Sequence, residues 1–84
     1  MQNNRSAILY RMVLPDHVCP FGLRAKALLE HACVAFEDRI LGSREAVDSF
    51  KAKHGVVTTP LIFIDGEAIG GSRELETYLE RQPR

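Results

Sequence analysis

The order of hydrophobic and polar positions divides the first half of the chain into a strand, a helix and a second strand. Residues 7–14 form a nearly continuous apolar run, which predicts a buried strand. From Pro20 to Cys33 apolar residues recur at helical spacing, and residues 34–40 alternate as in a strand. We expect one parallel, right-handed βαβ unit. The inward-facing residues are expected to be Phe21, Ala25, Leu28, Leu29 and Ala32 in the helix, and Val34, Phe36 and Ile40 in the second strand.

The second half of the chain carries capping and turn signals around shorter elements. Ser43 is a suitable N-cap for a second helix, which Gly55 ends as a left-handed C′ residue. Residues 61–64 form a short apolar strand, Asp65-Gly66 is a typical two-residue hairpin turn, and residues 67–69 form the returning strand.

A last helix completes the predicted fold. Ser72 is expected to be its N-cap, and its inward-facing residues are Leu75, Tyr78 and Leu79. The predicted fold class is therefore α/β, in the order β-α-β-α-β-β-α, with a four-stranded mixed sheet flanked by three helices.

Composition restricts the class of protein. The 84 residues carry no formal net charge, which gives no reason to expect a nucleic-acid partner. Residues 1–6 lack the apolar core of a signal peptide, no apolar run is long enough to span a membrane, and two cysteines do not make a disulfide framework. We expect a single domain over residues 1–84, monomeric, in the cytoplasm.

Cys19 is the candidate for chemistry. The loop Pro15–Val18 joins the first strand to the first helix, and Pro20 suits the first helical position, where its missing N–H had no partner. Cys19 is then the N-cap, beside unpaired backbone N–H groups and the positive end of the helix dipole, which favours the thiolate. Position alone leaves a second interpretation equally open, in which Cys19 is a buried cysteine acting as a small hydrophobic residue.

Four short motifs in a fixed order resemble the glutaredoxin family of the thioredoxin fold. They are Cys19-Pro20-Phe21, Thr58-Thr59-Pro60, Asp65-Gly66 and Gly70-Gly71. The resemblance extends from Ile8 to about Leu79 and implies a thioredoxin-like fold and a glutathione-dependent thiol–disulfide oxidoreductase. Its implied partners are glutathione, as cosubstrate, and glutathionylated proteins or small disulfides.

The resemblance also implies roles for individual residues. Cys19 matches the nucleophile, and Phe21 the aromatic residue that lines the site. Thr59 matches the residue whose backbone pairs with glutathione, and Pro60 the proline held in cis. Gly71 and Ser72 match the loop and helix start that receive the γ-glutamyl carboxylate, a role that a helix N-terminus suits. Each motif also has an ordinary interpretation: β-formers at Thr58-Thr59, a trans proline, a glycine turn, and Ser72 as a simple cap.

Departures from the family pattern indicate a monothiol mechanism. Many relatives carry a second cysteine three residues after the first, where this chain has Gly22. Cys33 lies at the far end of the same helix, roughly 20 Å away, too far for a disulfide with Cys19. We expect Cys33 to be a core residue. The same distance prevents His17-Val18-Cys19 and His31-Ala32-Cys33 from sharing a zinc ion, so no metal site is predicted.

Other departures concern the groups that would bind glutathione. The loop before Cys19 is longer than usual, the family's lysine is missing, and Val57 replaces an arginine. The glycine carboxylate of glutathione then needs another cation. The candidates are Arg11, Lys51 and Lys53 for that carboxylate, Glu74 rather than Arg73 for the γ-glutamyl amine, and His17 for the thiolate, which Asp16 would oppose.

Two other functions compete with this hypothesis. A monothiol member of the family can hold a [2Fe–2S] cluster between two subunits with glutathione, although the usual motif there is Cys-Gly-Phe-Ser. Ser72-Arg73-Glu74-Leu75 and the last helix also resemble the N-terminal domain of glutathione transferases. A module that binds glutathione without redox turnover is therefore the third hypothesis.

Overall fold

A computed structural model of the protein describes residues 6–81. The absence of a signal peptide and the outer limits of the domain 1–84 were predicted mainly from residues that lie outside this range. Within it, the strands and helices alternate in the order expected of the predicted fold. The elements are β1 Ala7–Leu14, β2 His17–Val18, α1 Pro20–His31, β3 Phe36–Leu41, α2 Arg44–His54, β4 Leu61–Ile64, β5 Glu67–Gly70 and α3 Ser72–Glu80.

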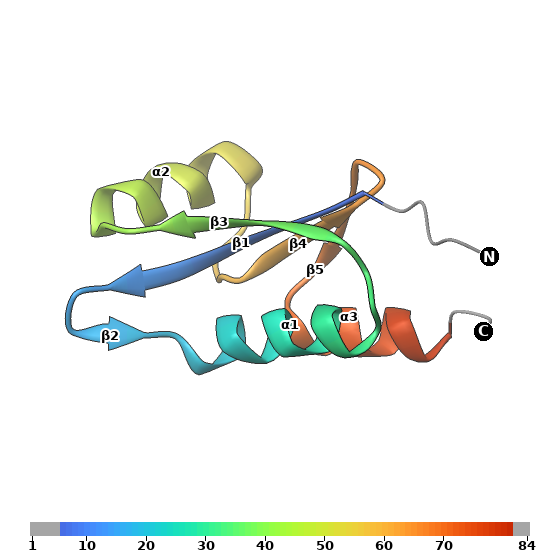
Figure 1. Cartoon of the computed structure of the whole chain (residues 1–84). Helices are drawn as coiled ribbons and strands as arrows, with labels where there is room; N and C mark the ends of the chain where they lie inside the picture. Colours follow the sequence, from blue (N-terminus) through green and yellow to red (C-terminus); the bar gives the residue numbers. More distant parts are fainter. Residues whose placement is uncertain (1–5, 82–84) are drawn as a thin grey trace.

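The sheet is mixed and centred on β1. Strand β3 pairs with β1 in parallel, β4 pairs with β1 antiparallel, and β5 pairs with β4 antiparallel. These are the four strands and the mixed pairing that the sequence predicts. Helices α1 and α3 lie side by side on one face of this sheet, and α2 lies on the other (Figure 1).

A fifth, two-residue strand was not predicted. His17 and Val18 were expected in a loop, but they form β2 and pair with Leu14 and Val13 at the end of β1. The chain reverses through Pro15 and Asp16, so that the long connection to Cys19 is a hairpin extending β1. Strand β2 can form because Val13 and Leu14 of β1 lie beyond the residues that pair with β3 and β4. Local sequence does not show how far these partner strands extend.

The core lies between the sheet and the pair α1 and α3. Because side chains alternate along a strand, Ala7 and Leu9 of β1 point to this face. They pack in one cluster with Ala25, Leu29, Val34, Ile62, Ile64 and Leu75. Tyr78 and Leu79 pack against this cluster, as predicted.

The predicted buried face of α1 is partly wrong. Its buried residues are Gly22, Ala25 and Leu29, whereas Phe21 is 62% exposed and Ala32 is exposed. The buried face includes a glycine, which contributes nothing to a hydrophobic pattern. In β3, likewise, Phe36 packs on the core but Ile40 is 47% exposed, and Val34 is buried just before the strand.

An aromatic cluster fills the space between the sheet and α2. The rings of Tyr10 and Phe50 are 4.6 Å apart between centroids, and those of Phe50 and His54 are 4.4 Å apart. Phe63 closes the cluster, 5.5 Å from His54. Arg39 lies over the ring of Tyr10 and donates a hydrogen bond to its hydroxyl. This face is stabilised by ring packing rather than by the aliphatic core.

Two helix boundaries are as predicted. Ser43 caps α2 by accepting a hydrogen bond from the N–H of Ala46 at 3.1 Å, and Gly55 ends the helix with φ 66°. The turn Asp65-Gly66 also has positive φ at both residues, 53° and 84°, as a tight hairpin requires.

Two other boundaries correct the predictions. Helix α1 ends at His31, and Cys33 is an exposed residue with φ 57°, not a core residue. The N–H of Cys33 donates to the Glu30 carbonyl and that of Val34 to the Leu29 carbonyl. This is the Schellman arrangement, and it places Cys33 at the left-handed C′ position.

At the other end of the core, Gly71 and not Ser72 is the N-cap of α3. Ser72 is the first residue of the helix and is buried. No helix among residues 6–81 has the length and hydrophobicity of a transmembrane segment.

Candidate active site

Cys19 occupies the N-cap of α1, as the sequence predicts. Its backbone is extended, with φ −66° and ψ 119°, and Pro20 follows as the first helical residue. The N–H of Cys19 donates to the Met12 carbonyl at 3.5 Å, which attaches the cysteine to β1. The thiol is free, its side chain makes no capping hydrogen bond, and the residue is partly exposed. A sulfur in this position can be reached from solvent and lies beside the positive end of the helix dipole.

The first turn of α1 places an exposed aromatic residue, Phe21, and a buried glycine, Gly22, next to this cysteine. Phe21 is largely exposed and points away from the core, at the edge of the candidate site. Gly22 is buried, and a Cβ atom placed on it would lie 2.9 Å from the Cβ atom of Arg11. Such a contact is shorter than real Cβ atoms make, and both atoms are attached directly to backbone. Position 22, where a second thiol would stand, therefore accepts a side chain only if α1 or β1 shifts.

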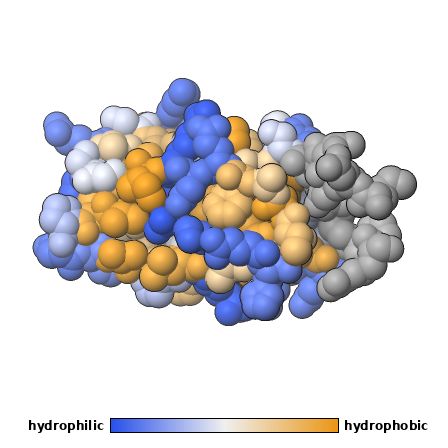
Figure 2. Space-filling model, viewed as in Figure 1, coloured by the Kyte–Doolittle hydropathy of each residue, from blue (hydrophilic) through white to orange (hydrophobic). Residues whose placement is uncertain are grey.

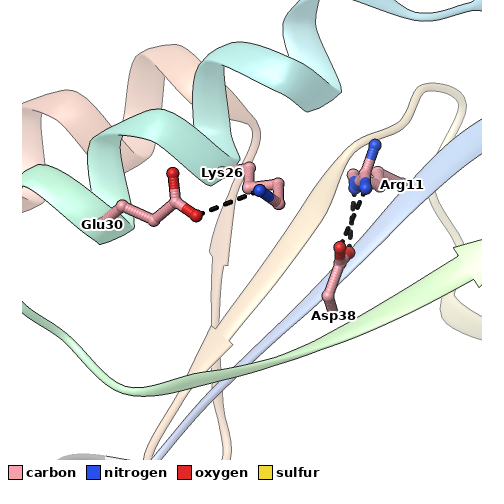
Figure 3. A network of polar contacts seen from close by, with 4 residues as sticks. All are labelled: Arg11, Lys26, Glu30 and Asp38. Carbon is pink, nitrogen blue, oxygen red and sulfur yellow. Dashed lines mark hydrogen bonds and ion pairs between the residues drawn. The ribbon is translucent and has the colours of Figure 1, made fainter.

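Arg11 is held in an ion pair with Asp38 of β3. Its Nε donates to Oδ1 of Asp38 and its Nη2 to Oδ2, both at 2.9 Å. Figure 3 shows the two side chains pointing toward each other from β1 and β3, near the separate pair of Lys26 and Glu30 on α1. The Arg11 side chain is 12% exposed, and its hydrogen bonds with Asp38 raise the pKa of its guanidinium. Arg11 is therefore paired with Asp38, and its role toward the glycine carboxylate of glutathione stays a prediction.

The loop into β4 reaches the same end of β1 as Cys19. The Thr59–Pro60 peptide bond is cis, as the resemblance implies, so the trans alternative is wrong. Pro60 is buried, and the next residue, Leu61, pairs with Tyr10 of β1. Since Cys19 is bonded to Met12, both Cys19 and the cis-proline adjoin the second half of β1.

The start of α3 adjoins the cis-proline. A Cβ atom on Gly71 would lie 3.6 Å from the Pro60 carbonyl oxygen. The N–H of Gly71 donates to Oε1 of Glu74 at 2.9 Å, and Glu74 also packs against Gly70, whose φ is 123°. Cys19, Pro60 and Gly71 are thus brought together around one end of β1 and β4. The γ-glutamyl carboxylate was expected to bind at the start of α3, where the N–H of Gly71 already donates a hydrogen bond to Glu74.

The remaining candidates lie farther from this centre. His17 is exposed in β2, two residues before Cys19. Lys51 and Lys53 stand in the last turn of α2, the helix on the opposite face of the sheet. No group of three or more His, Cys, Asp or Glu residues within 6–81 is arranged to hold a metal ion. The roles of all these residues toward a ligand stay predictions, as does the cluster-carrier hypothesis.

Sequence reasoning missed the contact between Arg11 and Gly22. A signal was available, since an arginine interrupts an otherwise apolar strand and an acidic residue lies at position 38 of the neighbouring predicted strand. A charged residue inside such a run needs a partner when it is buried. The pattern did not indicate that the arginine would face the active-site helix.

Comparisons with known proteins agree with this geometry. The family model described as Glutaredoxin matches residues 8–69, which include Cys19 and Pro60. Glutaredoxin 3 of Escherichia coli K12 is 40% identical over 64 residues, covering 75% of this chain and 77% of that protein. The hybrid peroxiredoxin hyPrx5 of Haemophilus influenzae is 45% identical over 60 residues, which cover 71% of this chain but only 25% of the relative.

A solved structure supports the fold directly. Glutaredoxin 1 from Francisella tularensis, complexed with cacodylate, superposes with a TM-score of 0.80 at 26% identity. The match covers 92% of this chain and 94% of that one. The thioredoxin-like fold predicted from the sequence is confirmed.

Proposed function

This chain belongs to the glutaredoxin family, whose members are thiol–disulfide oxidoreductases, and from that premise we propose that it removes glutathione from mixed disulfides by a monothiol mechanism. The observation that carries this proposal is a partly exposed thiol, Cys19, at a helix N-terminus, with a buried glycine three residues later where a second thiol would clash with Arg11.

The proposed cycle has two thiol–disulfide exchanges. The Cys19 thiolate attacks the glutathione sulfur of a mixed disulfide, a Cys19–glutathione bond forms, and the substrate leaves as its thiolate. A second glutathione thiolate then attacks the glutathione sulfur bound to Cys19. Oxidised glutathione leaves, and Cys19 is again a thiolate. In the net reaction, one mixed disulfide and one glutathione give the substrate thiol and one oxidised glutathione, so atoms and electrons balance.

The geometry favours one catalytic thiol over two. Cys33 is separated from Cys19 by the whole of α1, a distance of roughly 20 Å at the rise of an α-helix. A disulfide requires Cα atoms closer than about 7 Å. An internal disulfide between the two would require α1 to unfold, so external glutathione is the resolving thiol. A cytoplasmic location, where reduced glutathione is plentiful, is part of this proposal.

The proposed binding mode for glutathione uses backbone groups around Cys19. Thr59 would pair with the cysteinyl part, and the start of α3, at Gly71 and Ser72, would receive the γ-glutamyl carboxylate. Phe21 would cover the sulfur. In this mode Glu74 competes for the N–H of Gly71, so the incoming carboxylate must displace a carboxylate of the protein.

Replacement of each cysteine tests the proposal. Cys19→Ser should abolish glutathione-dependent reduction of a glutathione–mercaptoethanol disulfide. Cys33→Ser should keep close to wild-type activity, because Cys33 is exposed at the opposite end of α1. Mass spectrometry of the enzyme trapped without reductant should find one glutathione on Cys19. The opposite pattern, with Cys33 required and Cys19 dispensable, would show that the assignment is wrong.

A second candidate function is reduction of a peroxiredoxin, and the observation that favours it is the similarity to part of a hybrid peroxiredoxin. In this role the substrate disulfide would be the glutathionylated cysteine of a separate peroxidase. Peroxide consumption by a peroxiredoxin, glutathione and this protein should then depend on Cys19. A rate no higher than that with the Cys19→Ser variant would exclude this role.

A further inference from the structure

Strand β3 has a free outer edge. It pairs with β1 on one side, and no strand among residues 6–81 pairs with it on the other. The strand is six residues long, contains no proline, and pairs with β1 in a regular register over its whole length, without a bulge. Prolines and bulges usually protect such edges, because unpaired N–H and C=O groups are a template for another strand. The outer edge of β3 lacks these protections.

The sequence of β3 is complementary to itself about its third residue, Asp38. Glu37 and Arg39 stand one residue before and after it, and Phe36 and Ile40 stand two residues before and after it. An antiparallel pair of β3 strands centred on this residue places Glu37 opposite Arg39 of the second copy. The same pairing places Phe36 opposite Ile40 of the second copy. Residues directly opposite each other share one face of a sheet and interact, so each charge meets its opposite and each apolar residue an apolar one.

The charged pairs lie on the face of the sheet that carries α2. Arg39 already donates to Glu37 of its own strand and to the hydroxyl of Tyr10, over whose ring it lies. The Arg39 and Glu37 side chains are 46% and 56% exposed, so a second copy can reach both. In the antiparallel pair, two carboxylates and two guanidinium groups alternate in one network. Charges on a protein surface contribute more in such a network than as isolated ion pairs.

The apolar pairs lie on the other face, beside α1. Ile40 is 47% exposed, whereas Phe36 is partly buried and packs on the core. In the antiparallel pair, Ile40 of each copy lies over Phe36 of the other, which removes apolar surface from water. Figure 2 shows hydrophilic surface between two hydrophobic areas on the side along which β3 runs in Figure 1. The surface thus follows the apolar–charged–apolar order of the strand.

Asp38 meets Asp38 of the second copy at the centre of this pairing. Like charges opposite each other are unfavourable. Each carboxylate here, however, accepts two hydrogen bonds from the Arg11 guanidinium at 2.9 Å, so two neutral pairs face each other. Centring the pairing on Glu37 or on Arg39 instead sets that residue against its own copy and an apolar residue against Asp38. Only the register centred on Asp38 matches both the charged and the apolar residues.

We propose that two copies of this chain associate through their β3 edges, antiparallel and centred on Asp38, to form one continuous sheet. The occupant is a second copy because the order of charges and apolar residues along this edge is complementary to itself. Strand β3 lies on one side of β1, whereas Pro60 and Gly71 lie on the side of β4. The inference therefore goes beyond the proposed function and does not depend on it. It replaces the monomer that the sequence analysis expected.

Two charge reversals and their mixture test this interface. Arg39→Glu sets carboxylates opposite carboxylates, and Glu37→Arg sets guanidinium groups opposite guanidinium groups. In sedimentation velocity from micromolar to millimolar concentration, wild type should dimerise, and each variant alone should dimerise at least about tenfold more weakly. An equimolar mixture of the two variants should recover the wild-type affinity, because every charge again meets its opposite. Arg44→Glu, at an exposed position of α2, is the matched control and should dimerise like wild type.

Each other result contradicts the inference. A wild type that stays monomeric over the whole range shows that this edge is not an interface. A dimer that both variants form as readily as wild type uses another surface, and variants that do not associate when mixed refute the register. Hydrogen exchange of wild type is independent of any variant: amides within residues 36–41 should gain protection as concentration rises, and unchanged protection refutes the pairing. Failure of wild type to reduce the glutathione–mercaptoethanol disulfide would remove the proposed function alone.

Discussion

Gly22→Ala should destabilise the protein although alanine is the better helix former. The new Cβ atom would lie 2.9 Å from Cβ of Arg11. Neither atom can turn away, since each is bonded to backbone, and Arg11 is held farther out by two hydrogen bonds to Asp38. The backbone of α1 must therefore move away from that of β1. Overpacking of this kind costs about 1–3 kcal/mol, and replacing glycine within a helix returns about 1 kcal/mol.

The net expectation is a loss of about 1 kcal/mol in the free energy of unfolding, or a fall of about 4–8 °C in Tm for a domain of this size. Urea denaturation followed by circular dichroism measures the first quantity, and a thermal scan the second. Gly42→Ala is the matched control, because a Cβ there meets no atom within 4 Å and the glycine does not have positive φ. It should leave stability unchanged or raise it slightly. If Gly22→Ala were as stable as Gly42→Ala, the proposed close approach of α1 and Arg11 would be refuted.

Two further substitutions test other parts of the fold. Cys33→Gly should raise the free energy of unfolding by about 0.5–1 kcal/mol, because Cys33 has φ 57°, a conformation that glycine adopts without steric cost. Urea denaturation would measure this gain. A similar gain for Cys33→Ser would contradict the backbone explanation. Phe50→Ala should cost about 3–4 kcal/mol, because the ring is 7% exposed between Tyr10 and His54. Phe21→Ala, at a ring that is 62% exposed, is its control and should change stability by no more than about 0.5 kcal/mol.

Local signals were sufficient for most of the fold. Pro20, Ser43 and Gly55 mark helix boundaries through their own backbone and capping chemistry, and Asp65-Gly66 marks a turn for the same reason. Such signals act over a few residues, so the local sequence is enough to predict these helix boundaries and this turn. The cis bond before Pro60 was different, because it was expected from resemblance alone.

The errors arose where a residue's environment is supplied by a distant segment. Cys33 was expected in the core because cysteines usually are buried, but α1 ends early and a non-glycine residue occupies its left-handed end. The face of α1 was misjudged because the packing of Gly22 depends on Arg11, eleven residues earlier in β1. Strand β2 exists because β1 extends beyond its other partners. Hydrophobic periodicity along the sequence does not predict these contacts between distant segments.

The same distant contact bears on the chemistry. In the sequence, the missing second thiol at position 22 and the arginine in β1 have no visible connection. In the structure they are in contact, because a Cβ atom at position 22 would lie 2.9 Å from the Cβ atom of Arg11. A cysteine there would carry the same Cβ atom, and so the same clash, as alanine. A second thiol at position 22 would therefore require α1 to move from β1, at a cost like that expected for Gly22→Ala.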